Sequence, residues 1–276
     1  MDLLRHWNLR ERPFEATWDA RYFYAGPDHE EALSRLHYLV SETTMNIGLL
    51  TGEIGSGKTL TRAVFAGRID PVRFQVLTIE NAGFPLEELL GSILHRLEPG
   101  LALNGTGKLA RCELFERLAR NVTAAGRHLV LLLDEAQDMT PSTIHELRWL
   151  TNCNGGGASF LTLVLIGQPE LRRMIVGDPA INQRVSLRFH LNPLRAIDLE
   201  NFLHHRLRVA GHPMGNLFQP TATEALFAAT QGVPREVNRI AKLALEHAWV
   251  REGHRVEEPD IVAVVSDLQR HQALPA

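Results

Sequence analysis

Short apolar runs alternate with amphipathic stretches through the first two thirds of the chain. Strands are expected at residues 46–50, 72–79, 129–133, 161–166 and 187–191, of which 129–133 and 161–166 are the longest apolar runs. Apolar residues recur at helical spacing in residues 28–42, before the first of these segments, and in residues 86–97, 109–125 and 141–152, which lie between them. Thr140 followed by Pro141 is typical of a helix start. Strands that are apolar on both faces need helices on each side, so the alternation predicts a parallel five-stranded sheet flanked by helices.

The pattern changes after Pro193, where helical periodicity continues and no further strand is predicted. Helices are expected at residues 196–210, 234–250 and 259–270, and a short one from Thr221, where T-x-x-E resembles a capping box. The fold class is therefore α/β with a C-terminal all-α domain, and the expected domains are residues 1–194 and 195–276. Two glycine-rich segments, residues 98–108 and 154–157, are expected to form an exposed loop and a flexible turn.

The amino-acid composition indicates an ordinary globular protein, but it does not indicate which reaction the protein could catalyse. The 276 residues are 45% hydrophobic and 22% charged, which suits a globular chain with one large core and a smaller one. A net charge of −3 excludes an overall basic field that would attract nucleic acid, although a local basic patch could still exist. Cys112 and Cys153 match no metal or redox spacing and are interpreted as reduced thiols. The 13 histidines form no cluster with ligand spacing and are expected mostly on the surface.

Two features of the chain bear on where the protein works. The N-terminus lacks the apolar segment of a signal peptide, and no apolar run is long enough to be a transmembrane segment. We therefore expect a cytoplasmic protein, which would reach the inner membrane only through a partner.

A glycine-rich run follows the first predicted strand and begins a helix. It fits G-x-x-x-x-G-K-[ST] and consists of Gly52, Glu53, Ile54, Gly55, Ser56, Gly57, Lys58 and Thr59, with Leu60 next in the helix. Glycines let backbone N–H groups surround phosphate oxygens, and the helix N-terminus adds a favourable dipole. Lys58 is expected to reach the β- and γ-phosphates of ATP, and the Thr59 hydroxyl to bind Mg²⁺. The strand before the run and the helix after it argue against a mere glycine turn.

The third predicted strand ends in two carboxylates, Asp134 and Glu135. The C-terminal ends of parallel strands are where phosphates bind in such sheets. Asp134 is expected to join the Mg²⁺ shell, and Glu135 to orient or deprotonate the attacking water. Without the glycine-rich run, the pair could equally be a solvated strand end. Together the two motifs predict a Mg²⁺-dependent ATPase.

Four further residues are candidates for sensing the nucleotide. Gln168, at the end of the fourth strand, would lie between the two motifs, although a polar strand end is an equally good interpretation. Arg184 and, as second choice, Arg188 could reach the γ-phosphate of a neighbouring subunit, or they could form ordinary salt bridges. Arg235 follows Pro234 at a helix start, where the helix dipole mildly disfavours a cation. That conflict favours a role for Arg235 toward the nucleotide.

These motifs, in this order, resemble those of the ExeA/MshM-type AAA+ ATPases of type II secretion and pilus assembly. The resemblance is carried by the glycine-rich run, Leu-Asp-Glu-Ala-Gln-Asp at 133–138, Gly-Gln-Pro-Glu-Leu at 167–171, Gln-Arg at 183–184 and Gly-Val-Pro-Arg at 232–235. Residues 7–14 and 21–24 also resemble the opening segment of that family, which packs near the adenine. The resemblance covers nearly the whole chain and implies an AAA+ P-loop NTPase fold with a helical lid over the nucleotide.

The resemblance implies a role for each candidate residue, with ATP and Mg²⁺ as cofactors. The implied roles are Walker A for Lys58 and Thr59, Walker B for Asp134 and Glu135, sensor 1 for Gln168, arginine finger for Arg184 and sensor 2 for Arg235. The family also implies that copies of the chain form a ring or filament with ATP. Longer members continue into a membrane span and a peptidoglycan-binding domain.

Three functions remain open from the sequence. The leading hypothesis is an ATPase that couples ATP binding and hydrolysis to oligomer assembly, and so assists a secretion or pilus machine. The second rests on similarity of the core to transposition regulators of the TnsC/TniB class, which assemble on duplex DNA and recruit a transposase within a transpososome. The third is a nucleotide-gated scaffold with little turnover.

Overall fold

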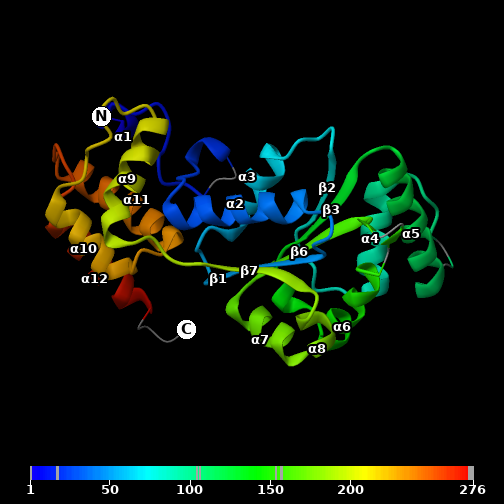
Figure 1. Ribbon diagram of the computed structural model, residues 1–276. Coiled ribbons are helices and arrows are strands. Elements are labelled where there is room, and N and C mark those ends of the chain that lie inside the picture. The colour runs from blue at the N-terminus through cyan, green and yellow to red at the C-terminus, as the bar shows by residue number, and fades with distance from the viewer. Residues whose placement is uncertain are drawn as a thin grey trace. The chain divides into compact units, whose positions relative to one another are not determined.

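The computed structural model describes residues 2–16, 19–103, 105, 107–152, 154–155 and 158–272. The chain divides into two compact units (Figure 1). The sheet unit consists of Glu30–Ile54 and Thr61–Leu191, and the helical unit of Met1–His29, Gly55–Leu60 and Asn192–Ala276. The expected domain limits, 1–194 and 195–276, remain a prediction.

The sheet unit is built on five parallel strands, as predicted. Their spatial order is β2 (Phe74–Ile79), β3 (His128–Leu133), β6 (Leu161–Gly167), β1 (Ile47–Gly52) and β7 (Val185–Leu191). β1, β3 and β6 are buried along their whole length. Because all strands run the same way, the C-terminal ends of β3, β6 and β1 lie along one edge of the sheet.

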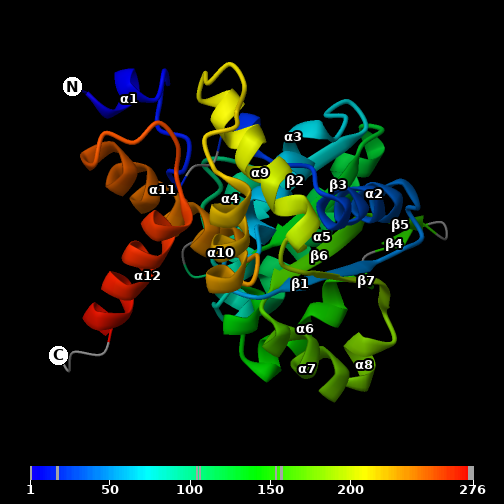
Figure 2. The same cartoon turned by 90° about the vertical axis from the view of Figure 1, so that its left-hand side faces the viewer.

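Helices cover both faces of this sheet, which explains why its central strands are almost entirely apolar. Figures 1 and 2 show α2 (Pro27–Ser41) and α3 (Lys58–Arg68) on one side, and α6 (Pro141–Leu150), α7 (Pro169–Gly177) and α8 (Pro179–Asn182) on the other. Successive residues of a strand point to opposite faces. Leu129, Leu131 and Leu133 accordingly pack in one core with α6, α7, α4 (Leu86–Leu97) and α5 (Lys108–Ala124). Gly48 leaves room for α2, because a Cβ there would lie 2.3 Å from Leu39 Cδ2.

Several elements differ from the predicted ones. β1 extends to Gly52 and β7 begins at Val185, both beyond the predicted apolar runs. In place of a simple turn, β4 (Asn154–Gly155) and β5 (Ala158–Ser159) form an antiparallel pair, while residues 156 and 157 lie outside the described part. The short helices α7 and α8 were not predicted. The predicted cap at Thr140 is confirmed, since its side chain accepts a hydrogen bond from the N–H of Thr143 at 3.1 Å.

Of the two cysteines, the structure describes Cys112, which packs in the core of the sheet unit. Cys112 is a buried free thiol, and burial raises its pKa. Cys153 lies outside the described residues.

The helical unit contains the four predicted C-terminal helices and the opening of the chain. The elements are α9 (Ala196–Val209), α10 (Pro220–Thr230), α11 (Pro234–Val250) and α12 (Glu258–Gln272), with α1 (Leu3–His6) and the 3-10 helix η1 (Ala20–Tyr22). The N-cap of α10 is Gln219, so the capping box expected at Thr221 is wrong by two positions. Within the described ranges, no helix combines the length and the apolar character needed to cross a bilayer.

The opening segment is held on the C-terminal helices by a buried arginine. Arg206 of α9 is 4% exposed and donates to the carbonyl oxygens of Pro13 (Nε, 2.7 Å) and Glu15 (Nη2, 2.9 Å). Its guanidinium lies 4.8 Å from the ring centroid of Tyr22, and burial lowers its pKa to about 10. Trp7 adds a hydrogen bond from Nε1 to the Leu245 carbonyl at 3.3 Å. The expected packing of this segment near the adenine remains a prediction.

A second polar cluster joins α11 to α12. Asp260 is fully buried and accepts hydrogen bonds from Arg251 (Nε and Nη2, each 2.7 Å), the N–H of Glu257 (2.8 Å) and His247 (2.9 Å). Burial alone would raise the pKa of Asp260, but these hydrogen bonds outweigh it and lower the pKa to about 2. The carboxylate therefore stays charged and fixes the ends of the two helices.

Candidate functional site

The glycine-rich run forms the connection between β1 and α3. Gly55 and Gly57 have φ angles of +81° and +98°, values that favour glycine strongly over any residue with a Cβ. Ser56 between them is 1% exposed, and its Oγ has no hydrogen-bond partner within the described part of the chain. Lys58 is the first residue of α3 and is 6% exposed. The run is therefore a tight loop, buried at Ser56 and Lys58, that ends at a helix N-terminus.

The chemistry of this loop fits a triphosphate. Left-handed glycine backbone places successive N–H groups on one concave side, and the first N–H groups of a helix have no partner within the helix. The buried Ser56 hydroxyl is a further donor, with no partner in the part of the chain that the structure describes. Thr59, half-buried in the first turn of α3, supplies a hydroxyl oxygen of the kind that Mg²⁺ prefers. The loop thus offers donors for phosphate and one candidate ligand for Mg²⁺.

The start of α11 lies against the same loop, within the helical unit. A Cβ on Gly55 would lie 2.6 Å from Arg235 Cβ and 3.3 Å from Val233 Cγ1. The N–H of Arg235 donates to the Gly55 carbonyl at 3.2 Å, while the Arg235 side chain is exposed. The structure therefore brings Arg235 to the loop through its backbone, and its predicted sensor role stays a prediction.

In the sheet unit, Asp134 follows β3 directly and is 2% exposed. Its Oδ2 lies 3.0 Å from Nε of Arg62, a residue of α3 that is 4% exposed. That Nε has no aligned hydrogen-bond acceptor among the described residues, so the contact is an ion pair with poor hydrogen-bond geometry. Sequence reasoning missed Arg62. The available signal was an arginine one helical turn after Lys58 on a helix that must pack against the sheet.

Glu135, the next residue, has an unusual backbone conformation. Its φ is 52° and its ψ 37°, a left-handed conformation that costs a non-glycine residue about 1–2 kcal/mol. Strain of this kind is concentrated at functional sites. The side chain is half-buried, and its Oε2 accepts a hydrogen bond from Nε2 of Gln137 at 2.8 Å. Glu135 is thus held in place by both its backbone and a neighbouring amide.

Gln137 also connects the end of β3 to the end of β6. Its Oε1 accepts a hydrogen bond from the N–H of Gln168 at 3.0 Å. Gly167 makes this approach possible, because a Cβ there would lie 2.5 Å from the same Oε1. The structure therefore brings Glu135 and the Gln168 backbone together through Gln137, which sequence reasoning treated only as part of a motif.

The two arginines near the start of β7 both make contacts within the sheet unit. Arg184 is half-buried and donates to the Ala180 carbonyl at 2.8 Å and to Asn152 Oδ1 at 3.3 Å. Arg188 is exposed, and its Nη2 donates to Asn182 at the carbonyl oxygen (2.9 Å) and at Oδ1 (2.6 Å). Either side chain would have to release hydrogen bonds before it could reach a neighbouring subunit.

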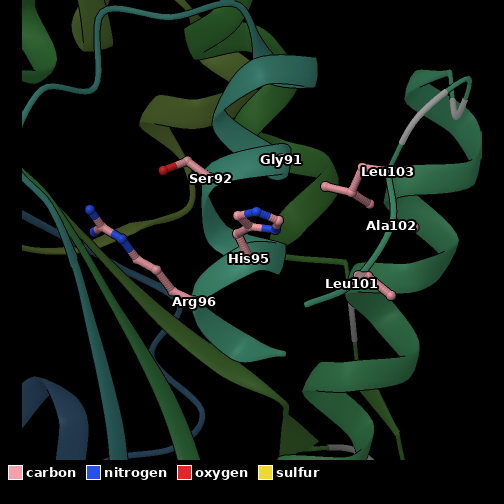
Figure 3. Close-up of a pocket in the computed structure, with 7 residues that line it drawn as sticks. All are labelled: Gly91, Ser92, His95, Arg96, Leu101, Ala102 and Leu103. Carbon is pink, nitrogen blue, oxygen red and sulfur yellow. The ribbon is translucent and has the colours of Figure 1, made fainter. Parts of the chain in front are cut away.

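A surface hollow of about 680 Å³ lies elsewhere in the sheet unit, between α4 and the segment that follows it (Figure 3). Ser92, His95, Leu101 and Leu103 are among its lining residues. Arg96, another of them, points away from the leucines in Figure 3 and donates from Nη1 to the Thr78 carbonyl of β2. None of the predicted site residues lines this hollow.

Comparison with known proteins supports the identification of the fold. Residues 41–175, which contain the glycine-rich loop and the Asp134–Glu135 pair, match the family described as AAA domain. Together with the parallel sheet and the helical C-terminal region, this match identifies an AAA+ P-loop NTPase fold. The chain is also similar to General secretion pathway protein A of Aeromonas hydrophila, with 34% identity over 92% of this chain. It spans only 46% of that relative's length.

Solved structures support the fold at low sequence identity. The ORC2 protein of Aeropyrum pernix, in ADPNP–ADP complexes, has 18% identity and a TM-score of 0.67 over 96% of this chain and 75% of its own. The Aeropyrum pernix ORC1 protein in complex with DNA has 21% identity and a TM-score of 0.64 over 92% of this chain and 70% of its own. At these identities the comparison establishes the shared fold.

Proposed function

We propose that this chain is a Mg²⁺-dependent AAA+ ATPase that couples ATP binding and hydrolysis to assembly of its own copies into a ring or filament, and so assists a secretion or pilus machine. The observation that carries the proposal is the loop around Lys58, with its two left-handed glycines and a buried Ser56 hydroxyl that has no hydrogen-bond partner among the described residues. Similarity to General secretion pathway protein A supports the choice of machine. The cytoplasm is the proposed location, with a protein partner at the inner membrane.

Each residue of the site has a proposed task. The loop N–H groups and Lys58 bind the triphosphate, and Thr59 and Asp134 hold Mg²⁺. The metal, when bound, neutralises charge that develops on the transferred phosphoryl group. Glu135 accepts the proton of the attacking water, and Gln137 keeps its carboxylate oriented. Gln168 and Arg235 report the state of the nucleotide to the two units.

Oligomerisation measured by light scattering or analytical ultracentrifugation tests the proposal. We expect larger species with Mg²⁺ and ATP alone, and no such species for Lys58→Ala, because that variant lacks the cation that pairs with the phosphates. Phosphate release is measured on the same samples. Assembly that strictly requires duplex DNA would instead favour the transposition regulator, and assembly without phosphate release would favour the scaffold. Absence of ATP binding by the folded wild-type chain would overturn the proposal.

A mixing experiment tests Arg184 as the residue that acts across subunits. Arg184→Ala and Glu135→Gln proteins should each be nearly inactive alone, and equal mixtures should regain part of the ATPase activity. The reason is that a mixed interface can pair an intact Glu135 with an intact Arg184. The same mixture with Arg188→Ala in place of Arg184→Ala is the matched control. If no mixture of Arg184→Ala and Glu135→Gln proteins is more active than the separate proteins, Arg184 does not act in trans.

A further inference from the structure

A buried histidine lies directly against the glycine-rich loop. His29, in the first turn of α2, is 6% exposed, and its ring meets Phe23 edge-on with 5.6 Å between centroids. On the loop side, His29 Nε2 lies 2.9 Å from the point where a Cβ on Gly57 would stand. The imidazole therefore occupies the space that the missing side chain of Gly57 leaves. The sequence, in which histidines were expected mostly on the surface, did not predict this contact.

His29 also makes a hydrogen bond to the loop. A ring N–H of His29 donates to the backbone carbonyl of Ser56. Burial has the largest effect on the pKa of His29 and lowers it, while this hydrogen bond and nearby Asp28 act in the opposite direction. The ring is consequently neutral at pH 7 and has a single N–H. That one donor is engaged by Ser56.

The orientation of the Ser56–Gly57 peptide decides which group faces a bound anion. In a planar trans peptide, the carbonyl and the N–H point in opposite directions. A carbonyl held toward His29 thus turns the N–H of Gly57 to the other side of the peptide. Glycine adopts left- and right-handed backbone with similar ease, so Gly57, with its φ of +98°, would not by itself prevent this peptide from flipping. A flipped peptide would present a carbonyl oxygen to the phosphates and repel them.

We propose that His29 is a positioning residue for nucleotide binding, which holds the Ser56–Gly57 peptide with its N–H toward the bound triphosphate. The inference rests on the proposed function, because it assumes that the loop binds ATP. The proposal means that a residue at the start of α2, outside the glycine-rich run, contributes to nucleotide affinity.

Two variants of matched length separate the hydrogen bond from packing. His29→Gln keeps an N–H donor at the distance of the ring nitrogen, whereas His29→Met fills similar space without a donor. We expect His29→Met to weaken binding of the ATP analogue AMPPNP about tenfold, or about 1.4 kcal/mol, and His29→Gln to stay within about twofold of wild type. In steady-state kinetics the KM for ATP should rise in His29→Met, while kcat at saturating ATP stays within about twofold because bound nucleotide selects the correct peptide orientation.

His37→Met is the matched control. His37 lies on the same helix, partly buried against Phe65 with 5.1 Å between ring centroids, and should be replaceable without loss of AMPPNP affinity. Equal affinities for His29→Met and His29→Gln, or a lower Tm in His29→Met with unchanged affinity, would overturn the inference. Wild-type binding of AMPPNP, and its loss in Lys58→Ala, are measured first. If wild type does not bind AMPPNP, the proposed function fails. If wild type binds AMPPNP but the His29 variants do not show the expected difference in affinity, only the positioning role fails.

Discussion

Replacing Glu135 with Gln is expected to reduce the kcat for ATP hydrolysis by at least about a hundredfold while nucleotide affinity stays within about threefold of wild type. The amide keeps the size of the carboxylate but cannot accept a proton from water. The left-handed backbone of Glu135 and its hydrogen bond from Gln137 hold the side chain in one place, so no neighbouring group readily replaces it. The measurements are steady-state phosphate release and calorimetric binding of AMPPNP.

The control is a second carboxylate of the same short segment. Asp138 is exposed and accepts a hydrogen bond from the same Gln137 amide at 3.3 Å, so Asp138→Asn changes the local charge without removing the proposed base. It should retain most of the activity. If Glu135→Gln and Asp138→Asn lose activity equally, or if Glu135→Gln turns over normally, Glu135 is not the base.

The sheet could be predicted from the sequence because its physical signal is strong. Apart from His128 and Thr162, strands β3 and β6 carry no polar side chain, and only burial on both faces explains such runs in a chain with an otherwise ordinary composition. Element ends were less well predicted. The T-x-x-E pattern at Thr221 suggested a cap, yet Pro220 fits the first helical turn and the helix begins there.

Tertiary contacts explain what the sequence could not predict about the site. The sequence predicts roles for Lys58, Thr59, Asp134 and Glu135 because each lies in a short motif, and the residue types of such a motif are enough to indicate its chemistry. Contacts of Arg62 with Asp134 and of Gln137 with the Gln168 backbone join residues that are far apart along the chain. A single sequence contains no signal for such pairs, and the buried position of His29 was hidden for the same reason.

Acid should destabilise the sheet unit through His128, the first residue of β3. His128 is 8% exposed, and its Nε2 lies 2.9 Å from Thr162 Oγ1. The Thr162 hydroxyl donates to the Met45 carbonyl at 3.3 Å, so it accepts from a neutral His128 that is protonated at Nε2. Burial lowers the pKa of His128 from 6.5 to about 4. A proton added to the other ring nitrogen would place an uncompensated charge inside the sheet.

The sign of the effect follows from which state binds the proton more tightly. Between pH 6.5 and about 4 the unfolded chain holds a proton on His128 that the folded chain lacks, so the free energy of unfolding falls as pH falls through that window. At about 1.4 kcal/mol per pH unit, the total loss is about 3 kcal/mol, with no further loss below pH 4 from this group.

Urea unfolding of wild type and His128→Gln at pH 7.5 and 4.5 measures this loss in the free energy of unfolding. The variant should lose about 2–3 kcal/mol less than wild type over this interval, because glutamine keeps a donor to Thr162 and cannot be protonated. Parallel pH profiles for the two proteins would show that His128 is protonated in the folded sheet as readily as in the unfolded chain.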